Sequence, residues 1–115
     1  MQRFVGHSNL KLDAARALAV KLNQQAMDDI EQGRTINNKL AIELRAVATY
    51  CTEVSVEITT EALRHSGASA IYEKSNMQRL LRDINVAAQH LMVSDISYEL
   101  LGQSHFGFPE VPPMA

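Results

Sequence analysis

A chain of 115 residues is the size of one domain and is long enough to bury a core without disulfide or metal support. Its formal net charge of −2, with both signs mixed along the sequence, gives no basic field for nucleic acid, so we expect no such partner. No window approaches the roughly 20 apolar residues of a membrane span. The single cysteine, Cys51, cannot form an internal disulfide. We therefore expect a cytoplasmic protein that does not enter the membrane.

The first half of the chain predicts a long helix from about Leu10 to Gln32. Ser8 or Asn9 is the expected N-cap, and the first nine or so residues are expected to lack regular structure. Gly33 tolerates a positive φ and is expected to end the helix. Its apolar positions are three and four residues apart: Ala15, Leu18, Leu22, Ala26 and Ile30.

A second long helix is expected from about Asn38 to Ser66, with Asn37 as its cap and Gly67 after its end. Its apolar seam alternates steps of four and three: Leu40, Leu44, Val47, Cys51, Val54 and Ile58. Such a seam is typical of a helix that packs nearly parallel to another one. With a short turn between them, the two helices should form an antiparallel hairpin.

Two shorter helices are predicted in the second half. The third should run from about Asn76 to Leu91 after a cap at Ser75, and the fourth should cover residues 95–106 after a cap at Ser94. The apolar stripe of the third helix has helical spacing: Met77, Leu80, Leu81, Ile84, Ala87, Ala88 and Leu91.

The expected fold class is therefore all-α, an antiparallel (up-and-down) four-helix bundle that forms a single domain over residues 1–115. No segment shows the alternation of a strand. Three prolines near the end predict that residues 107–115 form an extended tail.

The sequence contains none of the common hydrolase or phosphate-loop motifs. Its four histidines lack a second ligand at i+3 or i+4 in the spacing of a known metal helix, so we expect no metal site.

The polar side of the third helix is the best candidate for chemistry. Spacings of three, four and seven place Arg79, Arg82, Asp83 and His90 in one sector. Two arginines near a helix start suit an anionic group, and a histidine titrates near neutral pH. The alternative is a solvent-exposed face on which Arg79 pairs with Asp83, and the spacing alone favours that simpler interpretation.

The run SGASAIYEKSNMQRLLRDINVAAQH, residues 66–90, and the following SYELLG, residues 97–102, form a combined motif. A small-residue turn with an aromatic precedes a helix with an Arg-Asp pair and a closing histidine, and a Tyr-Glu-x-x-Gly segment follows. This pattern resembles the C-terminal helical domain of the acyl-CoA dehydrogenase superfamily, in particular its flavin-dependent hydroxylase and monooxygenase branch.

The resemblance implies that the chain is a fragment of a longer flavoenzyme. FAD or FMN would be shared with other domains or subunits, and reduced flavin would come from a reductase partner. The bundle would contribute to a homo-oligomer, a dimer or a tetramer, and the substrate would be a small aromatic molecule. The isolated chain would then be inactive.

The same resemblance implies roles for particular residues. Arg82 and Asp83 would help to bind the flavin, and His90 would lie near its ring system as the catalytic residue. A short turn would also lie near the flavin: Ser66, Gly67, Ala68 and Ser69.

One departure from the family pattern bears on the reaction. Acyl-CoA dehydrogenases often carry a catalytic glutamate beyond this helix, where the present chain has HLMVSD, residues 90–95. This favours an aromatic hydroxylase over an acyl-CoA dehydrogenase, which would need a base from elsewhere. A stand-alone helical oligomerisation module without a cofactor is the other alternative.

Overall fold

The computed structural model describes residues 1–66, 76–90 and 93–108 of the chain, and these contain helices but no strand. The helices are α1 (Gln2–Glu31), α2 (Asn38–His65), α3 (Asn76–Ala87) and α4 (Ile96–His105). The expected all-α class with four helices is therefore confirmed. In the described part of the chain, no helix is both long enough and apolar enough to span a bilayer.

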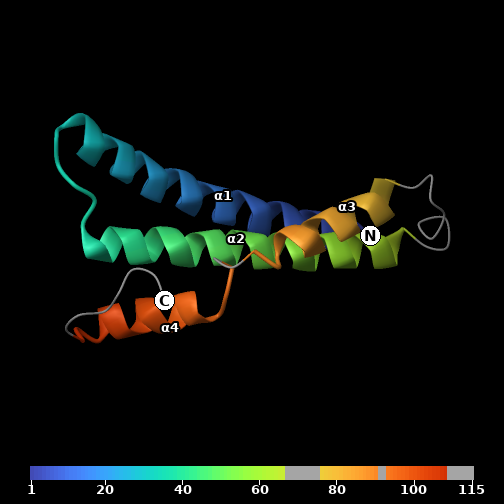
Figure 1. Cartoon of the computed structure of the whole chain (residues 1–115). Coiled ribbons are helices and arrows are strands. Elements are labelled where there is room, and N and C mark those ends of the chain that lie inside the picture. The colour runs from blue at the N-terminus through green and yellow to red at the C-terminus, as the bar shows by residue number, and fades with distance from the viewer. Residues whose placement is uncertain (67–75, 91–92, 109–115) are drawn as a thin grey trace.

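Helix α2 is the central element of an elongated domain that measures 51 × 25 × 24 Å. Helices α1, α3 and α4 each pack against α2. The described parts of α1, α3 and α4 make few contacts with one another. Helix α1 runs antiparallel to α2, and α3 and α4 follow one another along α2 (Figure 1). The arrangement differs from a strict up-and-down order in one respect, because α4 continues in the direction of α3.

The hairpin of α1 and α2 holds the main apolar cluster. Leu22 and Ala26 of α1 are buried against Leu40 and Val47 of α2, and Leu40 is only 1% exposed. The cap at Asn37 is confirmed, because its side-chain oxygen accepts a hydrogen bond of 2.7 Å from the Leu40 amide. The expected end of α1 is also confirmed, since Gly33 follows it with a φ of 75°.

A second row of α2 residues is buried under α4 and was absent from the predicted seam. Ile42 packs against Leu100 of α4 in a separate apolar cluster. Thr49 and Ser97 are fully buried, and their hydroxyls share a hydrogen bond of 3.0 Å across the interface. Because this row contains polar residues, its apolar periodicity is too weak to be seen in the sequence.

Three predicted helix ends were wrong. Helix α1 begins at Gln2, and Ser8 is buried inside it instead of capping it, because Phe4, Ser8 and Lys11 extend the three-and-four spacing back towards the N-terminus. Helix α3 ends at Ala87, four residues before Leu91.

The start of α4 also differs from the prediction. Asp95 occupies the N-cap position without a capping side-chain bond, while the Ser94 hydroxyl accepts a weaker bond of 3.3 Å from the Ile96 amide. The predicted cap at Ser75, Gly67 and most of the predicted tail lie outside the described residues.

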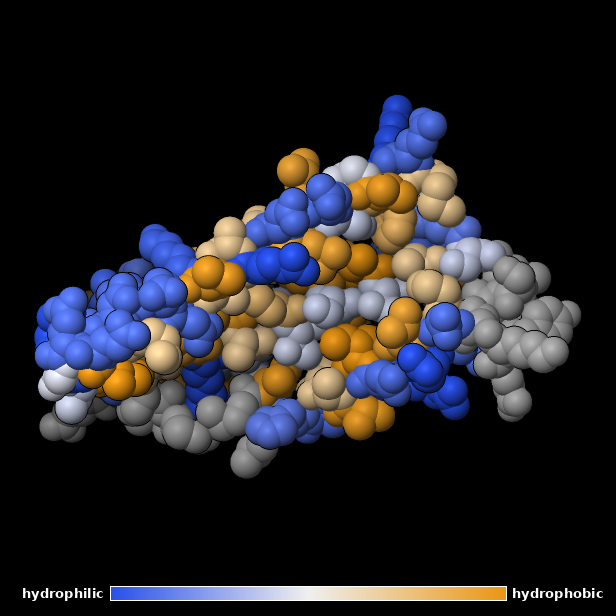
Figure 2. Space-filling model, turned by 90° about the horizontal axis from the view of Figure 1, so that it is seen from above, coloured by the Kyte–Doolittle hydropathy of each residue, from blue (hydrophilic) through white to orange (hydrophobic). Residues whose placement is uncertain are grey.

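Helix α1 leaves many large apolar side chains exposed. Viewed from above, apolar residues occupy the middle of the molecule and hydrophilic residues gather towards both ends (Figure 2). The exposed apolar residues of α1 are Val5, Leu10, Leu12, Leu18, Val20, Met27 and Ile30. An apolar surface of this kind is typical of a domain that packs against further protein.

Candidate functional site

The polar residues predicted on α3 lie at the surface. Helix α3 has no buried residue, and Arg79, Arg82 and Asp83 are all exposed. Arg79 and Asp83 do not form the ion pair considered above within the described part of the chain. Both arginines of α3 are therefore accessible to an anionic group.

Asp83 borders a shallow hollow of about 340 Å³ between α2 and α3. Ser55 and Thr59 line its α2 side, and Leu80 and Ile84 line its α3 side. Arg82, the neighbour of Asp83, does not line this hollow. The Arg-Asp pair is thus divided between an open surface and the edge of a hollow.

His90 lies in the turn that follows α3 and is exposed. Its backbone N–H donates to the Ala87 carbonyl at 3.1 Å, and its own carbonyl accepts from the Val93 amide at 2.9 Å. Because α3 ends at Ala87, His90 does not belong to the helical sector that contains Arg82. The backbone of this turn, instead of a continuous helix, sets the position of its imidazole.

A hollow lies beside this turn, where α2, α3 and the start of α4 meet. We call it the junction hollow; it has a volume of about 280 Å³. Its lining residues are Thr52, Glu53 and Val56 of α2, Asn85 and Ala88 of α3, and Val93, Ser94 and Asp95. The residues that line it carry two carboxylates, an amide and two hydroxyls, and they include Ala88 and Val93, which lie on either side of His90 in the sequence.

Ser66 lies at the opposite end of the candidate site. It caps the C-terminus of α2, is exposed, and its hydroxyl donates to the Ala62 carbonyl at 2.8 Å. Gly67, Ala68 and Ser69 lie outside the described residues. Ser66 is seven residues beyond Thr59, about two helical turns, so the described site residues are spread along α2 and do not converge on one cavity.

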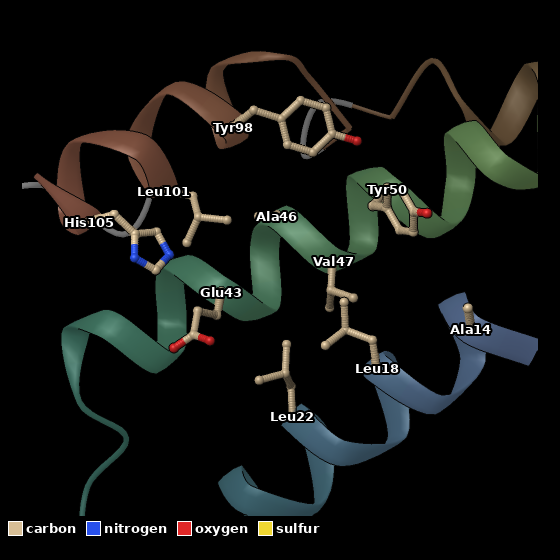
Figure 3. Close-up of a pocket in the computed structure, with 10 residues that line it drawn as sticks. All are labelled: Ala14, Leu18, Leu22, Glu43, Ala46, Val47, Tyr50, Tyr98, Leu101 and His105. Atoms are coloured by element: carbon tan, nitrogen blue, oxygen red, sulfur yellow. The ribbon is translucent and has the colours of Figure 1, made fainter. Parts of the chain in front are cut away.

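A further hollow, which is mainly apolar, was not found from the sequence. It is a groove of about 380 Å³ between α1, α2 and α4, which we call the three-helix groove (Figure 3). Its lining residues are Ala14, Leu18 and Leu22 of α1, Glu43, Ala46, Val47 and Tyr50 of α2, and Tyr98, Leu101 and His105 of α4. Leu18 and Leu22 point towards Val47, and Leu101 and His105 point towards α2 from the other side (Figure 3).

Tyr98 links the three-helix groove to the junction hollow. Its hydroxyl donates to the Glu53 carboxylate at 2.7 Å. Burial, followed by the hydrogen bond to Glu53 and the nearby carboxylate charges, raises the pKa of Tyr98 above its ordinary value. The phenol therefore remains protonated and acts as a hydrogen-bond donor.

Two further polar side chains, Arg45 and Cys51, are shielded from solvent. Arg45 is 7% exposed, and its Nε and Nη1 atoms have no hydrogen-bond partner in the part of the chain that the structure describes. Burial also raises the pKa of the Cys51 thiol, whose sulfur lies 3.5 Å from the Ala15 carbonyl oxygen. Cys51 is half-buried, which agrees with its predicted position in the apolar seam of the hairpin.

A last hollow lies where the start of α1 meets the end of α2. The rings of Phe4 and His65 are in contact there, with centroids 4.6 Å apart and a tilt of 33° between their planes, and His7 and Glu61 line the same hollow. No three His, Cys, Asp or Glu side chains of the described residues are grouped so as to hold a metal ion.

The whole set of helices can now be compared with known families. A model described as "Acyl-CoA dehydrogenase, C-terminal domain" matches residues 1–95. The chain belongs to this family. The match covers α1, α2 and α3 and includes every residue for which the sequence motif implied a role, but it does not test those roles.

Individual relatives of the acyl-CoA dehydrogenase C-terminal domain agree with this assignment. Indole-3-acetate monooxygenase of Pseudomonas putida is 27% identical over 108 residues, which cover 94% of this chain and 28% of that protein. Two solved structures share the fold with a TM-score of 0.90 over 99% of the chain: 3-HSA hydroxylase of Rhodococcus sp. RHA1, at 19% identity, and HsaA monooxygenase of M. tuberculosis, at 21% identity. The chain spans about 30% of either structure.

Proposed function

We propose that the chain is the C-terminal helical domain of a longer flavin-dependent monooxygenase that hydroxylates a small aromatic substrate. The observation that carries this proposal is the similarity along 94% of the chain to a monooxygenase more than three times as long. The shared fold with two proteins named as a hydroxylase and a monooxygenase supports the same reading. The longer protein would hold FAD or FMN, assemble as a homo-oligomer and receive reduced flavin from a reductase.

The exposed residues of this domain suit a flavin that is held mainly by other domains. The Arg82 guanidinium is exposed and has no ion-pair partner among the described residues, so it can meet the anionic part of a flavin nucleotide. Asp83 and Ser66 are also exposed and carry hydrogen-bonding groups, although Ser66 lies about two helical turns further along α2 than the hollow at Asp83. A cofactor at this surface would need a second wall from outside this chain, because the hollow at Asp83 is shallow and open.

A reduced flavin would supply the two electrons that insertion of one oxygen atom from dioxygen requires, with the second atom leaving as water. The contribution of this domain would be acid and base chemistry. A neutral imidazole at His90 can accept the proton of a phenolic substrate or donate a hydrogen bond. Its exposure and its position in a turn leave it accessible to a substrate bound against this surface.

The test uses the complete protein that contains this chain, supplied with reduced FMN or FAD, dioxygen and a panel of phenols. We expect hydroxylated product, and we expect His90→Ala to lower turnover about 100-fold or more, the usual contribution of a general acid or base. His7→Ala, an exposed histidine on α1, is the matched control and should not change turnover.

Other results would contradict the proposal. Turnover of an acyl-CoA with an artificial electron acceptor, without hydroxylation of any phenol, would assign the dehydrogenase reaction instead. Failure of the complete protein to bind FAD or FMN would favour a cofactor-free oligomerisation module. Unchanged turnover in His90→Ala at saturating reduced flavin would remove His90 from the reaction while leaving the domain assignment intact.

A further inference from the structure

The three-helix groove extends along its helices for about two helical turns. Each of its walls is a row of side chains on one helix: Ala14, Leu18 and Leu22; Glu43, Ala46, Val47 and Tyr50; Tyr98, Leu101 and His105. With a rise of about 1.5 Å per residue, each row extends about 10–12 Å along its helix, or two turns. Because α1, α2 and α4 run nearly parallel or antiparallel to one another (Figure 1), the groove follows the direction of the helices.

The apolar lining of this groove is incompletely covered. Leu18 is 42% exposed and Tyr50 is 41% exposed, although both line the groove. Val47 and Leu22, which line the same groove, are buried within the α1–α2 hairpin. A partner that covered Leu18 and Tyr50 would gain apolar contact along the whole groove.

We infer that the groove is the seat of an amphipathic helix from the part of the longer protein outside residues 1–115. The inference rests on the proposed function, which makes this chain one domain of a longer protein. Helices α1 and α4 flank α2 without packing extensively against each other. A helix laid between them would complete a four-helix arrangement by the packing that bundles use.

The relatives leave ample chain for such a helix. The present chain covers 28% of the monooxygenase relative and 30% of each solved structure. The other roughly 70% of such a relative must therefore pack somewhere, and the three-helix groove is an open, mainly apolar hollow of about 380 Å³ that could receive part of it.

The groove also specifies the chemistry of its occupant. The three walls call for an apolar stripe at i, i+3 or i+4, and i+7. Glu43 lines the groove and forms no ion pair within residues 1–66, 76–90 and 93–108, so a lysine or arginine on the occupant would complement it. The hydroxyl of Tyr50 and the imidazole of His105 are available at the same groove for polar residues beside the stripe.

Cysteine accessibility tests this directly. Leu18→Cys lies in the groove, and Val20→Cys, on the same helix and 60% exposed, is the matched control; both are made in a Cys51→Ala background. In the 115-residue chain, both thiols should react with a maleimide at similar rates. In the complete protein, Leu18→Cys should react about 100-fold more slowly, and Val20→Cys should change by less than about threefold, because protection follows the population of the open state.

The remaining outcomes each decide between occupants. Protection of Leu18→Cys that disappears on dilution of the complete protein would assign the groove to a second copy and overturn the inference. Protection that disappears on dialysis would assign it to a small molecule, with the same consequence. Glu43→Lys should raise the reactivity of Leu18→Cys in the complete protein about tenfold by repelling the basic residue of the helix, whereas Glu43→Gln should raise it less.

The inference and the proposed function can fail separately. A complete protein that hydroxylates a phenol with reduced flavin, but reacts equally fast at Leu18→Cys and Val20→Cys, would overturn only the helix assignment. Protection in a protein that binds no flavin would overturn only the reaction.

Discussion

The two halves of this domain differ in how completely they are buried. The α1–α2 hairpin contains the apolar cluster of Leu22, Ala26, Leu40 and Val47, whereas α3 has no buried residue. Of the described residues with implied chemical roles, Arg82, Asp83 and His90 belong to the less buried half, and Ser66 caps the end of α2. The difference indicates that the hairpin provides stability, while α3 and the following turn offer side chains to a surface that other protein would complete.

Leu40→Ala should give the largest effect and tests the buried side of this comparison. Leu40 is 1% exposed, so its truncation should lower the free energy of unfolding by about 3 kcal/mol through lost burial and a cavity. Urea denaturation followed by circular dichroism measures it. Leu80→Ala, at a position 48% exposed on α3, should cost less than about 1 kcal/mol. Equal costs would mean that the two halves do not differ in burial.

Thr49→Val tests the interface that joins the halves. The change keeps the shape of the side chain but removes the hydroxyl that bonds to Ser97, so we expect a loss of about 1 kcal/mol in the same denaturation measurement. Thr52→Val is the control, because the Thr52 hydroxyl bonds only to the Ala48 carbonyl of its own helix among the bonds described. A cost for Thr52→Val as large as that for Thr49→Val would argue against a specific role for the buried pair.

Tyr98→Phe tests how the phenol of α4, which bonds to Glu53 of α2, contributes to stability at alkaline pH. The pKa of Tyr98 is raised in the folded chain, so the unfolded chain loses this proton first, from pH 10.0 upward. The stabilisation is complete below that pH and is lost as the pH rises through the folded pKa. Urea midpoints measured from about pH 8 to about pH 11 should therefore fall less steeply in Tyr98→Phe than in the parent.

Cys51 contributes a second alkaline transition that must be separated from that of Tyr98. Burial raises its pKa above 9.0, and the sign of the effect is the same, because the buried thiol resists ionisation. Cys51→Ala should remove the part of the loss that begins near pH 9. If neither Tyr98→Phe nor Cys51→Ala reduces the fall of the urea midpoint at alkaline pH, other titrating groups cause that fall.

The ion pair of Lys11 and Glu57 should give the smallest effect. It joins α1 to α2 at the surface, with 58% of the Glu57 side chain exposed. A double-mutant cycle with Lys11→Met and Glu57→Gln should yield a coupling of about 0.5 kcal/mol or less, and high salt should reduce it. A coupling comparable to the Leu40→Ala effect would place electrostatics, and not burial, at the centre of the hairpin.

The sequence predicted the hairpin better than the rest of the fold. The seam from Leu40 to Val54 and the cap at Asn37 follow from local spacing and hydrogen bonding, and both were correct. The burial of Ile42 and Thr49 under α4 could not be seen, because it depends on a helix about 50 residues away in the chain. Ser8 was misread because a serine can cap a helix or be buried inside one, and only tertiary packing decides.

The candidate site shows the same limit. The polar residues Arg82, Asp83 and His90 could be selected from their sequence, yet the end of α3 at Ala87 removes His90 from the common helical sector. The three-helix groove has no sequence motif, since Leu18, Tyr50 and Tyr98 come together only when three helices pack. Leu18 was assigned to the apolar positions of the first helix, but its spacing does not show that it borders a groove with α4.

The central position of α2 has a consequence for how the domain moves. Since α1, α3 and α4 each depend on α2 more than on one another, either short helix can detach while the hairpin stays folded. Amide protons of α3 should then exchange with solvent through low-energy local opening, and those at the middle of α2 only through global unfolding. The domain would thus consist of a stable α1–α2 hairpin from which α3 and α4 can unfold independently of each other.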